Sequence, residues 1–224
     1  MKSKSTYLEQ AELVVNAVKY LASLGINGPT SGNISLRINS GFLITPSGID
    51  YKYLRPEKMV ILGNTGVNKI PVGIKPSSEW RIHKDIYDVR SEVCAIVHTH
   101  SEKATALSCL RREIPPFHYM VALAGGYNIR CAPYATFGTQ RLSDLTIEAL
   151  EDRYACLLSN HGTLALGLTL PNAVNMAIEV ESLAAQYLSA LSISEPELLS
   201  KKEMINIVER FKLYKDIKDL PDIG

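Results

Sequence analysis

Two histidines, His98 and His100, follow an apolar run that has the composition of a buried strand. Residues 93–97 form a short run rich in apolar and β-branched residues, with charge before it and polar residues after it. Side chains on a strand alternate between its faces, so both imidazoles point the same way if the strand continues through them. Neutral imidazole nitrogens at this spacing suit a divalent metal such as zinc. The alternative is a pair of surface histidines at a strand end.

A third histidine and a glutamate extend this candidate site. His161 stands in the tight turn Asn160-His161-Gly162. Alone it fits a hydrogen-bonded structural histidine, but beside His98 and His100 it would complete three nitrogen ligands and leave positions open for a substrate oxygen. Glu79 is expected in the first turn of a helix, where a carboxylate often complements the helix dipole. Next to a metal, the same group could move a proton to or from a substrate carbon.

The two remaining histidines are weaker candidates. His83 falls among charged residues of a predicted helix, so we expect it to be solvated. His118 falls in a Pro-rich segment and fits either a site or a loop. The metal site is therefore expected to use three of the five histidines.

Three stretches of small hydroxyl residues could bind an anion: residues 30–33, residues 45–48, and Ser77-Ser78. Each stretch alone fits a turn or a helix cap. If the three converged, their backbone N–H groups and the helix N-terminus would bind a phosphate without the lysine of a P-loop.

The elements that would position these groups follow from the hydrophobic spacing. Helical spacing predicts helices over about residues 8–24, 79–89, 101–110, 139–151, 171–191 and 203–214, with Ser77 or Ser78 as the cap of the second. Strands are predicted at 34–38 and 42–44, at 60–62 and 67–70 around a second hairpin turn, and at 93–100, 155–158 and 163–166. Residues 111–137 have no clear assignment. Hairpins mixed with helices favour an α/β fold with a largely antiparallel sheet, and no dinucleotide-binding glycine motif is present.

Composition narrows the class of protein. The chain has 224 residues and a net charge of +1, so we expect one domain over residues 1–224 and no electrostatic attraction to nucleic acid or to an anionic membrane. No apolar run reaches the length of a membrane span. The four cysteines are scattered, without a Cys-x-x-Cys pair, and are expected to be reduced. A cytoplasmic protein is expected.

The motif set resembles that of the class II aldolase/adducin family. The resemblance rests on five motifs in order: Thr30-Ser31-Gly32-Asn33-Ile34-Ser35, Ile44-Thr45-Pro46-Ser47-Gly48-Ile49, Pro76-Ser77-Ser78-Glu79-Trp80, His98-Thr99-His100 and Asn160-His161-Gly162. Residues 114–120, 124–126 and 131–139 are also similar to the aldolases of this family. The resemblance covers nearly the whole chain and implies a central sheet with helices on both faces.

The resemblance also implies roles for individual residues. It implies one Zn²⁺ per subunit held by His98, His100 and His161, with Glu79 as an acid/base that touches the metal when substrate is absent. Tyr119 would reach a neighbouring subunit's site in a homotetramer and protonate the aldehyde oxygen. Phe137 and Tyr214 would form the wall around the aldehyde. The implied phosphate ligands are Thr30, Gly32, Asn33, Ser47, Gly48, Ser77 and Ser78.

The activity implied is reversible cleavage of a 1-phosphoketose, L-fuculose-1-phosphate or a close relative, to dihydroxyacetone phosphate and L-lactaldehyde. One alternative is an L-ribulose-5-phosphate 4-epimerase of the same family. A second is a non-catalytic, adducin-like interaction module, which the three histidines and Glu79 argue against. A third is a lysine-dependent Schiff-base aldolase.

Overall fold

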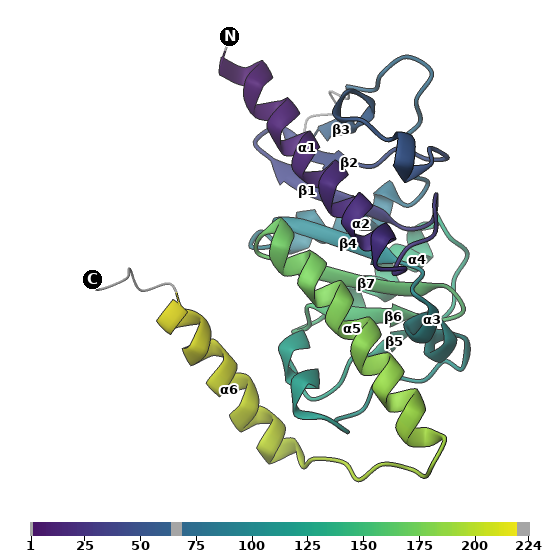
Figure 1. Cartoon of the computed structure of the whole chain (residues 1–224). Coiled ribbons are helices and arrows are strands. Elements are labelled where there is room, and N and C mark those ends of the chain that lie inside the picture. Colours follow the sequence, from purple (N-terminus) through teal and green to yellow (C-terminus); the bar gives the residue numbers. More distant parts are fainter. Residues whose placement is uncertain (1, 64–68, 219–224) are drawn as a thin grey trace.

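A seven-stranded sheet forms the centre of the computed structural model, which describes residues 2–63 and 69–218, and the side chains of residues 7–63 and 69–213 (Figure 1). The strand order is β3-β2-β1-β4-β7-β6-β5. Every neighbouring pair is antiparallel except β5 with β6. The strands are β1 (Asn33–Ile38), β2 (Gly41–Ile44), β3 (Val60–Gly63), β4 (Ala95–Thr99), β5 (Cys131–Ala132), β6 (Ala155–Leu158) and β7 (Gly162–Gly167).

Helices cover both faces of this sheet. The helices of the fold are α1 (Lys2–Ser23), α2 (Trp80–Val89), α3 (Glu102–Cys109), α4 (Gln140–Ala149), α5 (Leu170–Leu191) and α6 (Lys201–Lys218), with the 3₁₀ turns η1 (Tyr51–Tyr53), η2 (Pro56–Lys58) and η3 (Tyr119–Ala124). Helices α1 and α5 lie on one face, and α2 and α4 pack on the other. The predicted α/β fold with a largely antiparallel sheet and helices on both faces is confirmed.

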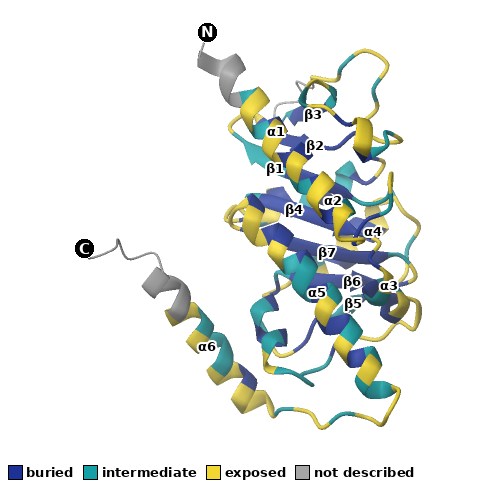
Figure 2. Ribbon diagram, viewed as in Figure 1, coloured by how far each residue is buried: buried dark blue, intermediate teal, exposed yellow. Residues whose placement is uncertain are grey.

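The strand alternation assigns each side chain to one of these two layers. On β4, Ala95 and Val97 join the cluster beneath α1 and α5, whereas Ile96 joins the cluster beneath α2 and α4. The strands of the sheet are buried almost throughout (Figure 2). His98 shares its parity with Ile96 and therefore belongs to the face covered by α2.

Two details differ from the sequence prediction or fall outside the described residues. Helix α2 begins at Trp80, so Glu79 is its N-cap residue and not a member of its first turn, and neither serine is the cap. Ser77 instead accepts a hydrogen bond on Oγ from the Glu79 amide, at 3.3 Å. The second predicted hairpin is supported by the antiparallel bridge of Ile61 with Lys69, but its turn includes residues 64–68, which lie outside the described residues.

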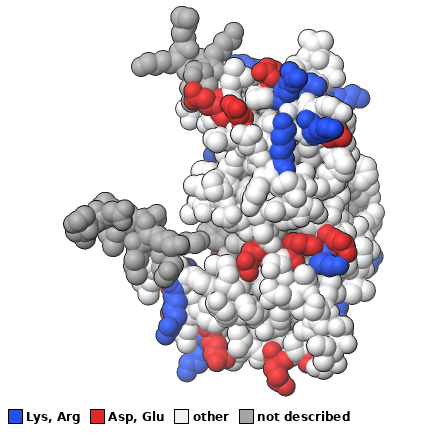
Figure 3. Space-filling view, in the orientation of Figure 1, with Lys and Arg blue, Asp and Glu red and all other residues white. Residues whose placement is uncertain are grey.

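The surface carries charges of both signs (Figure 3), as the net charge of +1 predicts. On the face shown in Figure 3, lysines and arginines lie among aspartates and glutamates. Within the described part of the chain, no helix is long and apolar enough to cross a bilayer.

Candidate active site

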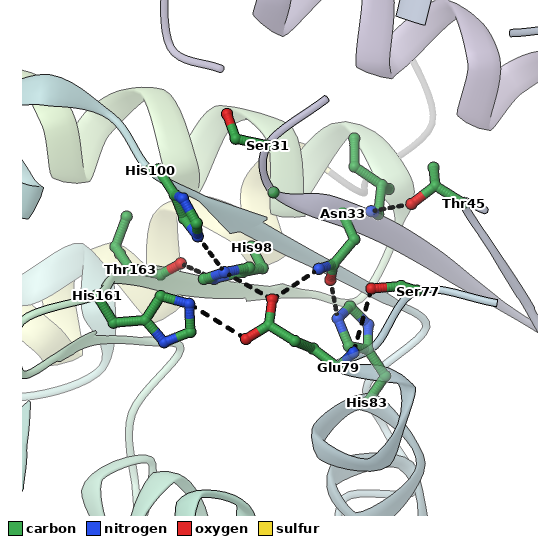
Figure 4. A network of polar contacts seen from close by, with 12 residues as sticks. Ser31, Asn33, Thr45, Ser77, Glu79, His83, His98, His100, His161 and Thr163 are labelled. Atoms are coloured by element: carbon green, nitrogen blue, oxygen red, sulfur yellow. Dashed lines mark hydrogen bonds and ion pairs between the residues drawn. The ribbon is translucent and has the colours of Figure 1, made fainter. Parts of the chain in front are cut away.

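Three histidines meet where β4 and β7 lie side by side. The Nε2 atoms of His98 and His100 are 2.9 Å apart, and the three ring centroids of His98, His100 and His161 are 4.8 to 5.0 Å apart. Each pair of rings meets edge to face, with interplanar angles of 70° to 75°. The spacing predicted from the His-x-His pattern therefore places both strand histidines on one side, and the β6–β7 turn adds the third (Figure 4).

The β6–β7 turn is built to place His161 against the end of β4. Asn160 adopts a positive φ of 56°, a conformation that asparagine tolerates better than most residues. The following residue, Gly162, approaches β4 so closely that a Cβ atom there would lie 2.3 Å from the carbonyl oxygen of Thr99. Only glycine permits this approach, so the local geometry requires Gly162 and favours asparagine at position 160.

Glu79 points from the N-cap of α2 into the three histidines. Its Oε2 atom lies 3.1 Å from His98 Nε2, and its Oε1 atom lies 3.2 Å from His161 Nε2. Asn33 donates a hydrogen bond from Nδ2 to Oε2 at 3.0 Å. Burial alone would raise the pKa of Glu79, but His98, His161 and the Asn33 hydrogen bond hold it well below its ordinary value. The carboxylate is therefore ionised.

Two of the three histidines, His100 and His161, are held in the neutral form that binds a metal. Burial, reinforced by the neighbouring His98, lowers the pKa values of His100 and His161 to about 4, so both rings are neutral near pH 7. Burial also acts to lower the pKa of His98, but the Glu79 carboxylate and the Thr163 carbonyl raise it overall. His98 donates a hydrogen bond from Nδ1 to Thr163 O at 2.9 Å, and a backbone carbonyl in this place fixes the ring so that Nε2 faces the ligand.

These four side chains fit a bound metal ion. One ligand atom from each of Glu79, His98, His100 and His161 lies within 4.8 Å of the other three. Glu79 Oε1 is buried and accepts no hydrogen bond from a described residue, as expected of an oxygen that faces a cation. Three imidazole nitrogens and one carboxylate form a donor set for zinc or a similar transition metal, whereas magnesium and calcium prefer oxygen ligands.

The predicted phosphate ligands line a pocket beside this cluster. The pocket has a volume of about 380 Å³. Three loops contribute to it, and its lining includes all seven residues predicted from the sequence: Thr30, Gly32, Asn33, Ser47, Gly48, Ser77 and Ser78. Glu79, His100 and His161 line the same pocket. The convergence that could not be derived from the sequence is therefore present in the structure.

The backbone explains how the loops come together. Ser47 N donates to Lys75 O at 2.9 Å, and Ser77 N donates to Thr45 O at 3.2 Å. Because these two amides already donate hydrogen bonds between the loops, the donors available to a phosphate are hydroxyl groups and other backbone amides. No lysine or arginine is among the described residues that line the pocket. The N-terminus of α2, which follows Ser78 and Glu79, supplies a partial positive charge there.

The three predicted aromatic residues lie in different places. Phe137 lines the pocket together with Tyr134. Tyr119, on η3, is half-exposed and is not part of the pocket lining; its ring packs against His118 and Phe211. Tyr214 falls within α6, but its side chain lies outside the described residues.

The expectation that His83 is solvated is wrong. Its side chain is fully buried beneath β1 and is hydrogen-bonded to Asn33 and Ser35. Its charged sequence neighbours Lys84 and Asp85 point elsewhere, because residues adjacent along a helix lie on different faces. The four-residue spacing of Glu79, His83 and Tyr87 would have placed His83 on the same helix face as Glu79.

Comparisons with known proteins identify the family to which this chain belongs. The family described as Class II Aldolase and Adducin N-terminal domain matches residues 12–188. The 5-methylthioribulose-1-phosphate/5-deoxyribulose-1-phosphate aldolase of Rhodospirillum rubrum is 49% identical over 208 residues, which cover 93% of each chain. The L-fuculose phosphate aldolase of Escherichia coli K12 is 44% identical over 205 residues, 91% of this chain and 94% of that one.

A solved structure of an L-fuculose 1-phosphate aldolase has the same fold. Its TM-score is 0.86 at 38% identity, over 90% of this chain and 95% of that chain. The named relatives are aldolases, a kind of lyase, which confirms the predicted enzyme class. With the family match spanning most of its length, this chain belongs to the class II aldolase and adducin family.

Proposed function

We propose that this protein is a zinc-dependent aldolase that cleaves a 1-phosphoketose between C3 and C4, releasing dihydroxyacetone phosphate and a short aldehyde. The observation that supports this most is the convergence of Glu79 with His98, His100 and His161 beside a pocket of hydroxyl groups and backbone amides. The pocket is suited to a phosphate, and the cluster is suited to charge developing on the sugar oxygens.

His98, His100 and His161, with Glu79 when substrate is absent, would hold the zinc ion. Bound zinc would stabilise the negative charge that develops on the ketose oxygens while the C3–C4 bond breaks. The histidines are rigidly placed for this task, since two of them lie on or next to a central strand and the third is fixed by the β6–β7 turn.

Glu79 would carry the proton at C3. In cleavage it delivers a proton to C3 of the three-carbon fragment, and in condensation it removes the same proton. The structure supplies an ionised and buried carboxylate, which suits the base of the condensation direction. We further propose that Tyr119 of a neighbouring subunit protonates the aldehyde oxygen in condensation and accepts the proton of the C4 hydroxyl in cleavage. This role requires an oligomer, and light scattering on the purified protein is expected to show a homotetramer.

The pocket would bind the 1-phosphate and orient the sugar. Ser47, Ser77 and Ser78 provide hydroxyl groups on two paired loops. Binding energy gained at the phosphate, away from the breaking bond, holds the reacting carbons in place. Phe137 lines the same pocket with an apolar ring, and we propose that it contacts the aldehyde half of the substrate. Tyr214 is proposed to add to this aldehyde wall.

The relatives suggest which sugars to test. L-Fuculose-1-phosphate, 5-deoxyribulose-1-phosphate and 5-methylthioribulose-1-phosphate all carry a phosphate on C1 and an apolar methyl or methylthio group at the far end. Their cleavage yields lactaldehyde, acetaldehyde and methylthioacetaldehyde. An apolar end matches the wall formed by Phe137, so we propose a 1-phosphoketose with a deoxy or thioether terminus, with L-fuculose-1-phosphate as the first candidate.

A coupled assay for dihydroxyacetone phosphate tests the proposal. The enzyme is assayed on the three sugars with and without EDTA, and zinc is then restored. We expect release from at least one sugar, loss with EDTA and recovery with zinc. Conversion of L-ribulose-5-phosphate to D-xylulose-5-phosphate, with no release from the three sugars, would replace the proposal by the epimerase alternative.

A further inference from the structure

Behind Glu79, one face of α2 and one face of β1 present polar side chains in matching order. The helix contributes Glu79, His83 and Tyr87, and the strand contributes Asn33, Ser35 and Arg37. Four residues of helix advance about 6 Å, and two residues of strand advance about 6.6 Å. The two repeats therefore stay in step, and each polar residue of the helix meets the polar residues of the strand.

These contacts form an unbroken chain that ends at Glu79. Tyr87 OH lies 2.8 Å from Ser35 Oγ, which lies 2.6 Å from His83 Nδ1. The other ring nitrogen, His83 Nε2, lies 2.5 Å from Asn33 Oδ1. Asn33 Nδ2 then donates to Glu79 Oε2 at 3.0 Å. Figure 4 shows the Asn33 amide between Glu79 and His83.

The carboxylate at one end fixes the direction of every hydrogen bond. An ionised carboxylate only accepts, so Asn33 must turn its NH₂ group toward Glu79 and its carbonyl oxygen toward His83. His83 must then donate from Nε2 and accept at Nδ1. Ser35 Oγ donates a hydrogen bond to His83 Nδ1 and accepts one from Tyr87 OH. The opposite tautomer of His83 would favour a rotated amide, which would place Asn33 Oδ1 against the carboxylate.

Water does not compete with this arrangement. The exposed fractions are 0% for His83 and Ser35, 3% for Asn33 and 5% for Tyr87. A buried amide that loses its donor has no ready replacement, so the orientation of Asn33 depends on His83. Burial also keeps His83 neutral, because it lowers the pKa of the imidazole to about 3, with a further contribution from His98.

We propose that His83 is a positioning residue for Glu79: by donating from Nε2 to Asn33, it fixes the amide that holds the Glu79 carboxylate. This inference rests on the proposed function only in that Glu79 is taken as the proton carrier. The hydrogen-bond chain itself is a property of the protein without substrate.

Two substitutions separate the donor from the bulk of the side chain. His83→Gln can place an amide N–H near the position of Nε2, whereas His83→Leu fills similar space without a donor. We expect His83→Leu to lower kcat about fivefold to a hundredfold, the range for leaving a buried acceptor, here Asn33 Oδ1, without its donor, with KM and zinc content little changed. His83→Gln should stay close to the wild-type kcat.

A control measures the effect of lost stability alone. Ile86 is buried on the same helix but belongs to the apolar cluster, so Ile86→Val should lower the melting temperature without lowering kcat. If His83→Leu keeps the wild-type kcat, or if His83→Gln loses as much kcat as His83→Leu, the positioning role is wrong.

A spectroscopic measurement tests the chain without activity. In a long-range ¹H–¹⁵N spectrum of histidine-labelled protein, His83 is assigned by its absence from His83→Gln, and the pattern of a protonated Nε2 with a bare Nδ1 is expected. A protonated Nδ1 would overturn the inference. If the wild-type enzyme releases no dihydroxyacetone phosphate from any of the three sugars, the proposed function fails, and this spectrum still decides the direction of the chain.

Discussion

Asn33 on β1 lies directly opposite His98 on β4 in the antiparallel register, and both side chains contact the same oxygen of Glu79. Asn33 Nδ2 is 3.0 Å and His98 Nε2 is 3.1 Å from Oε2. The other oxygen, Oε1, is left facing His161. The sheet register therefore orients the carboxylate: one oxygen is held by the sheet, and the other is directed into the candidate metal site.

Replacing Glu79 with glutamine should remove the proton carrier while keeping the shape of the site. The amide cannot exchange a proton with C3, so we expect kcat to fall by roughly 10²- to 10⁴-fold, the usual contribution of a general acid or base. The three histidines remain, so zinc content should persist. Steady-state kinetics and metal analysis of the same sample check both expectations.

The control for this variant is Glu102→Gln. Glu102 is exposed in the first turn of α3 and pairs with Lys103, so its kcat should match wild type. Undiminished turnover in Glu79→Gln would remove Glu79 from the mechanism.

Removing one candidate metal ligand should weaken zinc binding. His161→Ala takes one of three imidazoles from the cluster, and we expect the zinc affinity to fall by more than the roughly 10- to 100-fold typical of losing an outer-shell partner. A competition titration with a chelating dye measures this. His118→Ala is the matched control, because His118 accepts a hydrogen bond from the Met120 amide on η3 and is not part of the cluster. Equal affinities in the two variants would contradict the assignment.

The sequence predicted the cluster better than the residues that support it. His98, His100 and the turn around His161 are recognisable because strand alternation and the Asn-His-Gly sequence depend on near neighbours. The charged neighbours Lys84 and Asp85 predict a solvated His83, because the polar positions of β1 that bury it are about 50 residues away in the sequence. Whether a polar helix face is buried depends on the strand that packs against it. The periodicity of the helix sequence does not show which strand that is.

The pocket shows the same limit. Residues 30–33, residues 45–48 and Ser77-Ser78 each have the composition of a loop or a cap, and only the pairing of Ser47 with Lys75 and of Ser77 with Thr45 brings two of the loops together. Helix α2 also begins at Trp80, one residue later than predicted. Glu79 occupies the N-cap position, from which its side chain points into the histidine cluster. Local propensity cannot anticipate a cap that is chosen by a distant site.

Replacing Ser78 with alanine should weaken substrate binding more than it lowers turnover. Ser78 is exposed in the pocket at the start of α2, and its hydroxyl group is proposed to bind the phosphate. Losing one hydrogen bond to a charged group should raise KM roughly tenfold or more, with a smaller change in kcat. The inhibition constant of inorganic phosphate should rise in parallel. Ser40→Ala, in the exposed β1–β2 turn at the other end of β1 from Asn33, should change neither value.

The metal-free protein should lose stability as the pH falls from about 6.5 toward 4. The pKa values of His100 and His161 are lowered to about 4 and that of His83 to about 3, against about 6.5 in an unfolded chain. Below pH 6.5 these histidines therefore bind protons in the unfolded state but stay neutral in the folded state. Each such proton lowers the free energy of unfolding by about 1.4 kcal/mol per pH unit. His98 does not change the slope in this range, because its pKa is raised: its contribution is fully present below about pH 6.5 and is lost only as the pH rises above that value.

The three lowered histidine pKa values therefore give a net loss of stability between pH 6.5 and 4. Urea titrations in EDTA at several pH values measure the slope. His83→Gln should give a shallower slope than wild type, because it removes one of the three groups while leaving His100 and His161 in place. A free energy of unfolding that stays constant or rises between pH 6.5 and 4 would contradict the prediction for the wild type. An unchanged slope in His83→Gln would show that His83 is not held neutral by burial between α2 and β1.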